Sequence, residues 1–344
     1  MNQLPLAVVN VGLVTGVGHN AASTCAAIRA AVDNFEDTGF VDGAGEWIRG
    51  CQVAVPQSLR GSAKLKKMAA EAIAECLAGC PESQISEIPL LFCGPERERK
   101  GQPLGDEREF MHALQEALGG RLHPASKVIA QGHASIAFAL QMAREMIQHH
   151  GARRVLVAAA DSLLVSSTLD WFEGRERLLT SKNSNGFIAG EAGAAILLEA
   201  AAIDGRGLTC IGLGIGKENA TIHSDQPLRA DGLCEAIRNS LSEAGWNMGD
   251  IDFRICDLAG EQYHFKEASL ALLRLLRQRK EEFDIWHPAD CIGEVGAAIG
   301  LVLISVLKVA CEKGYSKGHR MLAHLGNDDG TRAAMVFTWR QNGA

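Results

Sequence analysis

The chain has 344 residues, of which 47% are hydrophobic and 22% are charged, and its formal net charge is −7. This composition is typical of a globular protein with room for two domains or for one large two-part core. The acidic balance, without a basic stripe, argues against nucleic acid as a partner.

The first apolar run lies within residues 1–14 and has neither a basic segment before it nor a small-residue cleavage site after it. It predicts a strand rather than a secretion signal, and scattered cysteines indicate a reducing compartment, so we expect a cytoplasmic protein. Cys76 and Cys80 lie four residues apart with no second ligand pair nearby, so we expect no metal site. The apolar stretch 297–310 holds Lys308 and predicts a buried helix, not a membrane span.

Segments of the first part of the chain recur later in the same order. Residues 69–94 and 233–260 each read as an amphipathic helix, a polar turn and a β-rich run, and Ile73 matches Ile237 at an offset of 164. Strands that alternate with helices predict largely parallel sheets covered by helices. The repeat therefore predicts two related halves, residues 1–204 and 205–344.

The repeat continues at two glycine turns. Gly132 and His133 match Gly293 and Glu294 at an offset of 161. The helices that follow both turns have no strong polar face, so both are predicted to be buried between two sheets. The charged stretch 95–109 interrupts the first half and is predicted to be a solvated loop.

A duplicated α/β unit with two buried helices resembles the thiolase-like superfamily, and the motifs resemble its β-ketoacyl-ACP synthase branch. "NGFIAGEAGAAILLEAA" (185–201) is the most specific match, to the family's "DGFV-GEGAG-LVLE" block. "GEVGAAIGLVLISVLKVA" (293–310) resembles its "GH-LGAAG" helix, and "HLGNDDGTRAAMVF" (324–337) resembles its "FGFGGTNAALVF" end. The resemblance implies an α/β/α/β/α five-layer fold with two mixed sheets around buried central helices, and it implies no cofactor.

The family's chemistry uses a cysteine at a helix N-terminus, which carries the acyl group, and two histidines. Matched residue by residue, the cysteine falls on His133, the first histidine on Ala259, the second on Glu294, and a family lysine on Ala289. A second register would place the cysteine on Ile129. The length of the following helix and the repeat favour His133. The positions that hold the fold thus remain, whereas the reacting groups are replaced.

Two functions are open at this point. The replaced groups favour a non-catalytic relative with a structural or partner-binding role, similar to a chain length factor or to an accessory protein of secretion clusters. The alternative is an enzyme that binds an acyl thioester and uses His133 with Glu294 for hydrolysis or decarboxylation. Cys291 and Asp328 are further candidates for the same pocket, whereas His264 is predicted to lie at the surface or in packing.

The resemblance also implies a homodimer or a heterodimer with an intact ketosynthase-like relative. An acyl carrier protein or a secretion adaptor is a further candidate partner. The resemblance implies that the strand after the first buried helix, residues 153–161, pairs with its mate across a twofold axis. This strand carries no charge between Val155 and Ala160, so as an uncovered sheet edge it would be prone to aggregation. Such an interface would bury on the order of 2,000 Å² or more.

Overall fold

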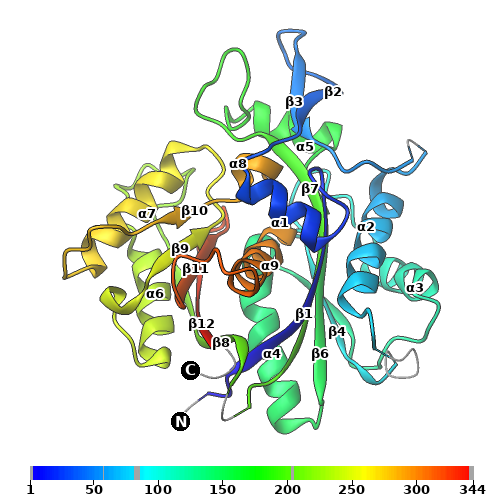
Figure 1. Cartoon of the computed structure of the whole chain (residues 1–344). Helices are drawn as coiled ribbons and strands as arrows, with labels where there is room; N and C mark the ends of the chain where they lie inside the picture. The colour runs from blue at the N-terminus through cyan, green and yellow to red at the C-terminus, as the bar shows by residue number, and fades with distance from the viewer. Residues whose placement is uncertain (1–2, 57, 81–85, 203–204, 341–344) are drawn as a thin grey trace.

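The computed structural model describes residues 3–56, 58–80, 86–202 and 205–340 (Figure 1). The first repeat consists of β1 (Leu6–Thr15), α1 (Ala21–Arg29), β2 (Phe35–Val41), β3 (Trp47–Cys51), α2 (Gly61–Cys76), β4 (Leu90–Gly94), α3 (Glu107–Ala117), β5 (Lys127–Ala130), the 3₁₀ turn η2 (Gly132–Ala134), α4 (Ser135–His149), β6 (Arg154–Ser162), α5 (Ser166–Glu173) and β7 (Ala189–Ala200). The second consists of β8 (Gly207–Lys217), α6 (Asp231–Ala244), the 3₁₀ turn η3 (Met248–Asp250), β9 (Phe253–Cys256), α7 (Gln262–Leu275), β10 (Ile285–Trp286), α8 (Ala289–Ile292), the 3₁₀ turn η4 (Gly296–Ala298), α9 (Ile299–Glu312), β11 (Arg320–Gly326) and β12 (Thr331–Arg340).

The strands confirm the predicted duplication. Within the described residues, all strands except β2 and β3 follow one hydrogen-bonded path, β10-β9-β11-β12-β8-β1-β7-β6-β4-β5. Read inward from each end, its two arms have equivalent orders, with β5, β4, β6, β7 and β1 matching β10, β9, β11, β12 and β8. The arms are the two predicted mixed sheets, and their strands are joined where Leu6 of β1 pairs with Cys210 of β8 and Ala7 with Thr209. The predicted boundary at 204/205 falls at residues 203–204, outside the described residues.

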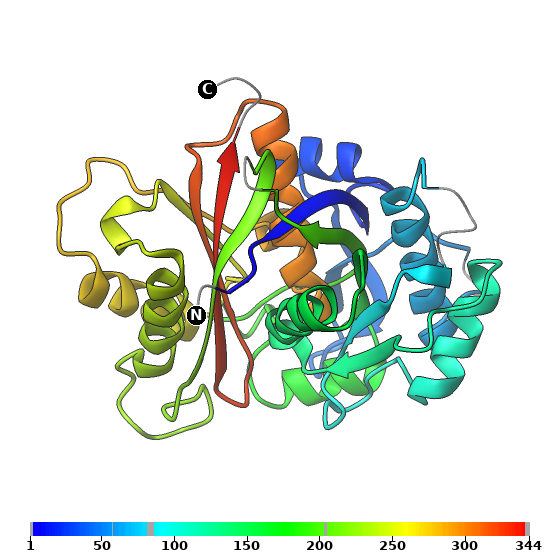
Figure 2. The same ribbon diagram turned by 90° about the horizontal axis from the view of Figure 1, so that it is seen from below.

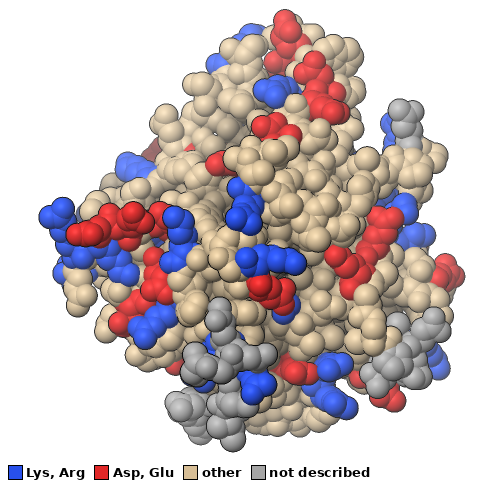
Figure 3. Space-filling view, viewed as in Figure 1, with Lys and Arg blue, Asp and Glu red and all other residues tan. Residues whose placement is uncertain are grey.

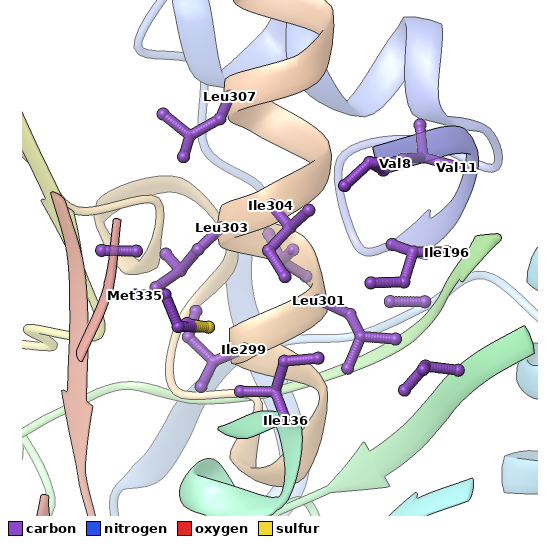
Figure 4. Close-up of a cluster of buried hydrophobic side chains, with 14 of the residues drawn as sticks. Val8, Val11, Ile136, Ile196, Ile299, Leu301, Leu303, Ile304, Leu307 and Met335 are labelled. Carbon is purple, nitrogen blue, oxygen red and sulfur yellow. The ribbon is translucent and has the colours of Figure 1, made fainter. Parts of the chain in front are cut away.

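Five layers are stacked as the resemblance implied (Figures 1 and 2). Helices α2 and α3 cover the outer face of one arm, and α6 and α7 cover the outer face of the other, while α4 and α9 lie between the arms. Helix α9 is buried without interruption from Ile299 to Lys308. In Figure 4, Leu301 projects toward Ile196 of β7 and Leu303 toward Met335 of β12, so α9 supplies core side chains to both arms.

Helix α4 differs from the prediction that both central helices are buried all round. Its residues Gln141, Glu145 and His149 are exposed, whereas Ile136 and Leu140 are fully buried. The exposed residues are spaced four apart and therefore form one polar face of the helix. Both helices lie between the two sheets as predicted, but the expected lack of a polar face holds only for α9.

The prediction that residues 153–161 form a sheet edge is also wrong. β6, which contains most of residues 153–161, pairs with β4 on one side and β7 on the other, and its Val157 is fully buried. The strand at the end of this arm is β5, which in the described structure pairs only with β4. An apolar run without charges describes an interior strand at least as well as a covered edge. None of the described helices has the length and apolar character needed to span a bilayer.

Candidate active-site pocket

His133 lies in the η2 turn that joins β5 to α4. Gly132 starts this turn with a φ of +53°, a left-handed conformation that favours glycine, and a Cβ there would collide with the Glu96 carboxylate. Ile129 lies in β5, one strand residue before its end. The register that places His133 at the helix start is therefore confirmed, and Ile129 is excluded from that position.

Two carboxylates hold the His133 ring. Its Nε2 lies 3.0 Å from Glu294 Oε1, and its Nδ1 lies 3.0 Å from Asp257 Oδ2. Asp257 also accepts a 2.9 Å hydrogen bond from the Gly326 amide, and Glu294 accepts one of 2.8 Å from the Gly296 amide. The predicted contact between His133 and Glu294 is confirmed. Asp257 was missed, although a lone carboxylate directly after the β-rich run that becomes β9 was a readable signal.

The two carboxylates favour the imidazolium form of His133. Burial alone would lower the pKa of His133, but the charge of Glu294 and the hydrogen bonds to Asp257 and Glu294 outweigh it and raise this pKa well above its ordinary value. Burial would raise the pKa of Asp257, yet the hydrogen bond from His133 lowers it. His133, Asp257 and Glu294 therefore form a triad that favours a protonated histidine, with each ring nitrogen 3.0 Å from a carboxylate oxygen.

The prediction that Glu294 is the repeat equivalent of His133, at an offset of 161, is wrong. The backbone equivalent of Gly132 is Gly296, which has a φ of +56° and begins the η4 turn before α9. The corresponding offset is 164, the same as that between Ile73 and Ile237. Glu294 therefore precedes the second turn by two residues, and the equivalent of His133 is Ala297. Glu294 reaches His133 because the two turns lie against each other.

His133 opens into a cavity of about 210 Å³. One wall is apolar, formed by Leu163, Trp171, Phe172, Phe187 and Ala259. The rest is acidic and includes Glu96, Glu98, Asp257, Glu261, Glu294, Asp328 and Asp329, against the cations Arg99 and Arg177 and the histidines His133 and His264. The cavity therefore combines an aromatic wall with an excess of carboxylates.

The two arginines are already neutralised. Arg177 donates to both oxygens of Glu261 at 2.5 and 2.8 Å and to Asp328 at 2.6 Å. Arg99 donates to both oxygens of Asp161 at 2.7 and 2.5 Å. Burial would raise the pKa of Asp328, but the adjacent Arg177 lowers it. Neither cation is left to bind an anionic ligand without displacing a carboxylate.

Arg99 corrects the interpretation of residues 95–109 as a solvated loop. Its side chain is only 8% exposed, and Glu96 and Glu98 from the same segment line the cavity. The segment continues into α3, whose N-cap Asp106 accepts hydrogen bonds from the amides of Arg108 and Glu109. The charges of this stretch thus face inward as well as outward, which their sequence pattern does not reveal.

The remaining candidate residues lie partly in the His133 cavity and partly outside it. Ala259, Asp328 and His264 line the cavity, and burial lowers the pKa of His264 to about 4. Ala289 begins α8, outside the cavity lining. Cys291 lines a separate cavity beside Arg29 and Tyr315, and burial raises its pKa to about 11.

Two kinds of site are not found among the described residues. No cysteine is among the residues that line the His133 cavity. No group of three or more His, Cys, Asp or Glu side chains in the described ranges has an arrangement that could hold a metal ion.

Comparison with known proteins identifies the fold. The model of the 3-oxoacyl-[acyl-carrier-protein] synthase III family matches residues 129–216, which include α4, β6, α5 and β7. The structure also superposes on solved ketosynthases over nearly its whole length. The chain has the thiolase-like fold of the ketosynthases. The family resemblance stated from the motifs is thereby confirmed at the level of the fold.

Three solved structures illustrate this likeness. A ketosynthase in complex with its chain length factor from Xenorhabdus doucetiae is 11% identical, with 98% of each chain covered and a TM-score of 0.74. A type II polyketide ketosynthase in complex with its acyl carrier protein is 15% identical, with 98% of this chain and 100% of that chain covered and a TM-score of 0.79. A ketosynthase from module 6 of the bacillaene synthase of Bacillus subtilis 168 is 13% identical, with 99% and 73% covered and a TM-score of 0.76. Among curated proteins, none matches this ketosynthase-like chain.

Proposed function

We propose that this chain is a non-catalytic ketosynthase-like protein that serves as a structural or partner-binding accessory factor. The observation that carries the proposal is the pair of carboxylates on His133, the residue at the nucleophile position. A nucleophile or general base needs an unprotonated nitrogen within reach of the substrate. Here each ring nitrogen faces a carboxylate at 3.0 Å.

The charge of the cavity supports the same proposal. Seven of its lining residues are acidic, and both lining arginines are bound to carboxylates. A free malonyl carboxylate or a phosphate-bearing thioester would meet this surplus of negative charge. Such an encounter is unfavourable in a partly buried site, where charges are weakly screened.

The alternative, hydrolysis or decarboxylation by His133 with Glu294, has the required contact but also has Asp257 on the other nitrogen. A histidine oriented by one carboxylate can act as a base, because its second nitrogen is free to take a proton. The second carboxylate removes that freedom. The proposal therefore treats the triad as a structural ion cluster between β9, η2 and the segment before η4.

Acyl transfer gives the direct test. We expect no acyl adduct on residues 128–136 after incubation with acyl-CoA or acyl-ACP, because the covalent step has no acceptor there. Intact mass followed by peptide mapping measures this, and mapping is needed because ten cysteines elsewhere could exchange with thioesters. A stable adduct on residues 128–136, or thioester hydrolysis that His133→Gln abolishes, would contradict the proposal.

Partner binding in the proposal rests on the β5 edge. Two of the structural neighbours are ketosynthases with a chain length factor. In this chain, β5 ends one arm of the sheet and pairs only with β4 among the described strands. An edge strand is a template for pairing with another chain. We therefore propose that β5 pairs with its own copy or with the same strand of an intact relative.

Light scattering and hydrogen exchange test this part separately. We expect a dimer, alone or after mixing with an intact relative, with protection of the amides of residues 127–130 on assembly. Substitutions in β6 do not probe this edge, because residues such as Val157 are fully buried in an interior strand. A monodisperse monomer with no assembly on mixing would contradict the proposed dimer.

A further inference from the structure

A hairpin formed by β2 and β3 projects from one end of the molecule (Figure 1). Its outer face carries two large apolar side chains, Val41 and Trp47, which pair directly across the strands. Trp47 is 58% exposed and Val41 is 51% exposed. Cross-strand partners point to the same side of a hairpin, so the two side chains form one exposed apolar pair.

The hairpin is held in a fixed conformation. Asp42 at the turn accepts hydrogen bonds from the amides of Ala44 and Glu46 at 2.8 and 2.9 Å. Glu173 of α5 accepts a 2.6 Å hydrogen bond from the Gly43 amide. At the base, β3 pairs with β7. Trp47 is therefore presented by an ordered element, which reduces the conformational entropy lost on binding.

The segment that carries the apolar pair is acidic. Residues 33–50 contain five acidic residues and a single basic one, Arg49, so this short segment holds more than half of the net charge of −7. Acidic side chains gather over this end of the molecule in Figure 3. Asp33, Glu36, Asp37 and Glu46 are exposed. An exposed tryptophan on a segment that is mostly acidic is typical of a contact surface with an apolar centre and a charged rim.

The inner face of the hairpin adjoins the His133 cavity. Ile48, which is 4% exposed, belongs to one apolar cluster with Leu163, Phe172 and Phe187, and these three residues line the cavity. A contact on the outer face thus lies one layer of side chains from the aromatic wall. On these two strands, the outer face is available for a partner, while the inner face packs into the core.

We propose that the β2–β3 hairpin is a docking element for a protein partner whose contact face is basic and contains an apolar recess for Trp47. This inference names a binding surface for the proposed partner-binding role and rests on that role. A second copy meeting this hairpin across a twofold axis would set carboxylates against carboxylates, which is unfavourable. The charge of the hairpin therefore selects a partner of opposite sign.

The test uses the full chain and a defined probe, a short amphipathic peptide of leucine and lysine. Calorimetric titration should show binding that weakens with salt, and a leucine–glutamate peptide should not bind. Trp47→Ser should weaken the affinity by about tenfold or more, as truncation of a central aromatic residue does. Leu273→Ser is the matched control, because Leu273 is 74% exposed on α7, away from the hairpin.

A pair of charge variants tests the rim without changing the apolar pair. The double variant Glu36→Lys with Asp37→Lys should also weaken binding, whereas Glu281→Lys with Glu282→Lys, exposed acids of the segment after α7, should not. The inference is overturned if the peptide does not bind, if hairpin and control variants behave alike, or if Trp47→Ser splits a homodimer. If it fails while no acyl adduct forms on residues 128–136, the non-catalytic proposal still stands.

Discussion

The two turns that start the central helices have the same backbone and different chemistry. Gln131, before η2, has φ and ψ of −126° and 24°, and Val295, before η4, has −111° and 17°. Each turn is hydrogen-bonded by a residue that ends or follows the matching strand of the other repeat. Asn327 Oδ1 accepts from the Ala134 amide at 3.1 Å, and Asp161 Oδ2 accepts from the Ala297 amide at 2.8 Å.

The side chains at these turns differ in what they face. The first turn presents His133 to the cavity and is bound by a neutral amide. The second turn carries Ala297 and is bound by the carboxylate of Asp161, which forms a buried ion pair with Arg99. Packing between the repeats therefore supports the same backbone conformation at both turns, although His133 and Ala297 carry different side chains. Fold likeness alone cannot establish activity at such a turn.

The largest expected effect on stability comes from replacing Asp161, the charged residue that binds the η4 turn. Asp161 is fully buried and binds Arg99 through both oxygens. Asp161→Ala leaves a buried arginine without its partner, so we expect a loss of about 3–5 kcal/mol in the free energy of unfolding. Chemical denaturation measures it. Glu107→Ala, which breaks the exposed pair with Arg97, should cost less than about 1 kcal/mol, and similar losses would contradict the assignment.

Alanine at the two turn glycines sharpens the comparison. Both positions have positive φ, which costs a non-glycine residue about 1–2 kcal/mol. A Cβ at Gly296 also collides with Asp161, which is fixed by Arg99, whereas the nearest atoms to one at Gly132 belong to the Glu96 carboxylate, the far end of a flexible side chain. Gly296→Ala should thus be the more destabilising. Gly151→Ala, with a φ of +71° and open space, isolates the backbone cost, and equal melting shifts for all three would refute the ordering.

The third prediction concerns the pH dependence of the triad. The pKa of His133 is raised in the folded state, so the stabilisation it gives is complete below its unfolded value of about 6.5 and declines as pH rises through the folded pKa. His133→Gln should cost about 2–3 kcal/mol at pH 6 and progressively less above it. His112→Gln at an exposed position provides the baseline. A ring that titrates near pH 6.5 by NMR would be incompatible with the triad.

The smallest effect is expected at the neutral partner of the first turn. Asn327 accepts from the Ala134 amide and donates to the Gln131 carbonyl at 2.7 Å. Asn327→Ala removes two uncharged hydrogen bonds, so we expect a loss of about 1–2 kcal/mol. Asn327→Asp keeps only the acceptor and adds charge to an acidic cavity. Urea titration should rank both below Asp161→Ala, and the reverse order would show that charge is not what distinguishes the turns.

The sequence predicted what depends on local pattern and repeat. Gly132 and the small-residue helix after it placed His133 at a helix start, and the repeated order predicted two equivalent arms. It could not predict contacts set by packing between distant segments. Asp161 lies 62 residues from its partner Arg99, and Asp257 lies 124 residues from its partner His133, so no local pattern relates the members of either pair.

The predictions that residues 153–161 form a sheet edge and that residues 95–109 form a solvated loop were wrong for the same physical reason. Apolar character of residues 153–161 reports burial, but it does not report whether a neighbouring strand or a second chain provides it. Likewise, the charges of Arg99 and Glu96 are inward-facing because Asp161 and the turn at Gly132 lie beneath them. Pairing between segments distant in sequence decides both outcomes.

Helix α9 also constrains how the protein is made. It is buried from Ile299 to Lys308 and supplies core side chains to both arms, including the arm whose strands precede it by many residues. During synthesis, the inner face of that first arm therefore emerges from the ribosome long before the helix that covers it. Nascent chains of this protein should depend on a chaperone until α9 has been translated, and ribosome-bound chains stopped before Ile299 should be sensitive to protease.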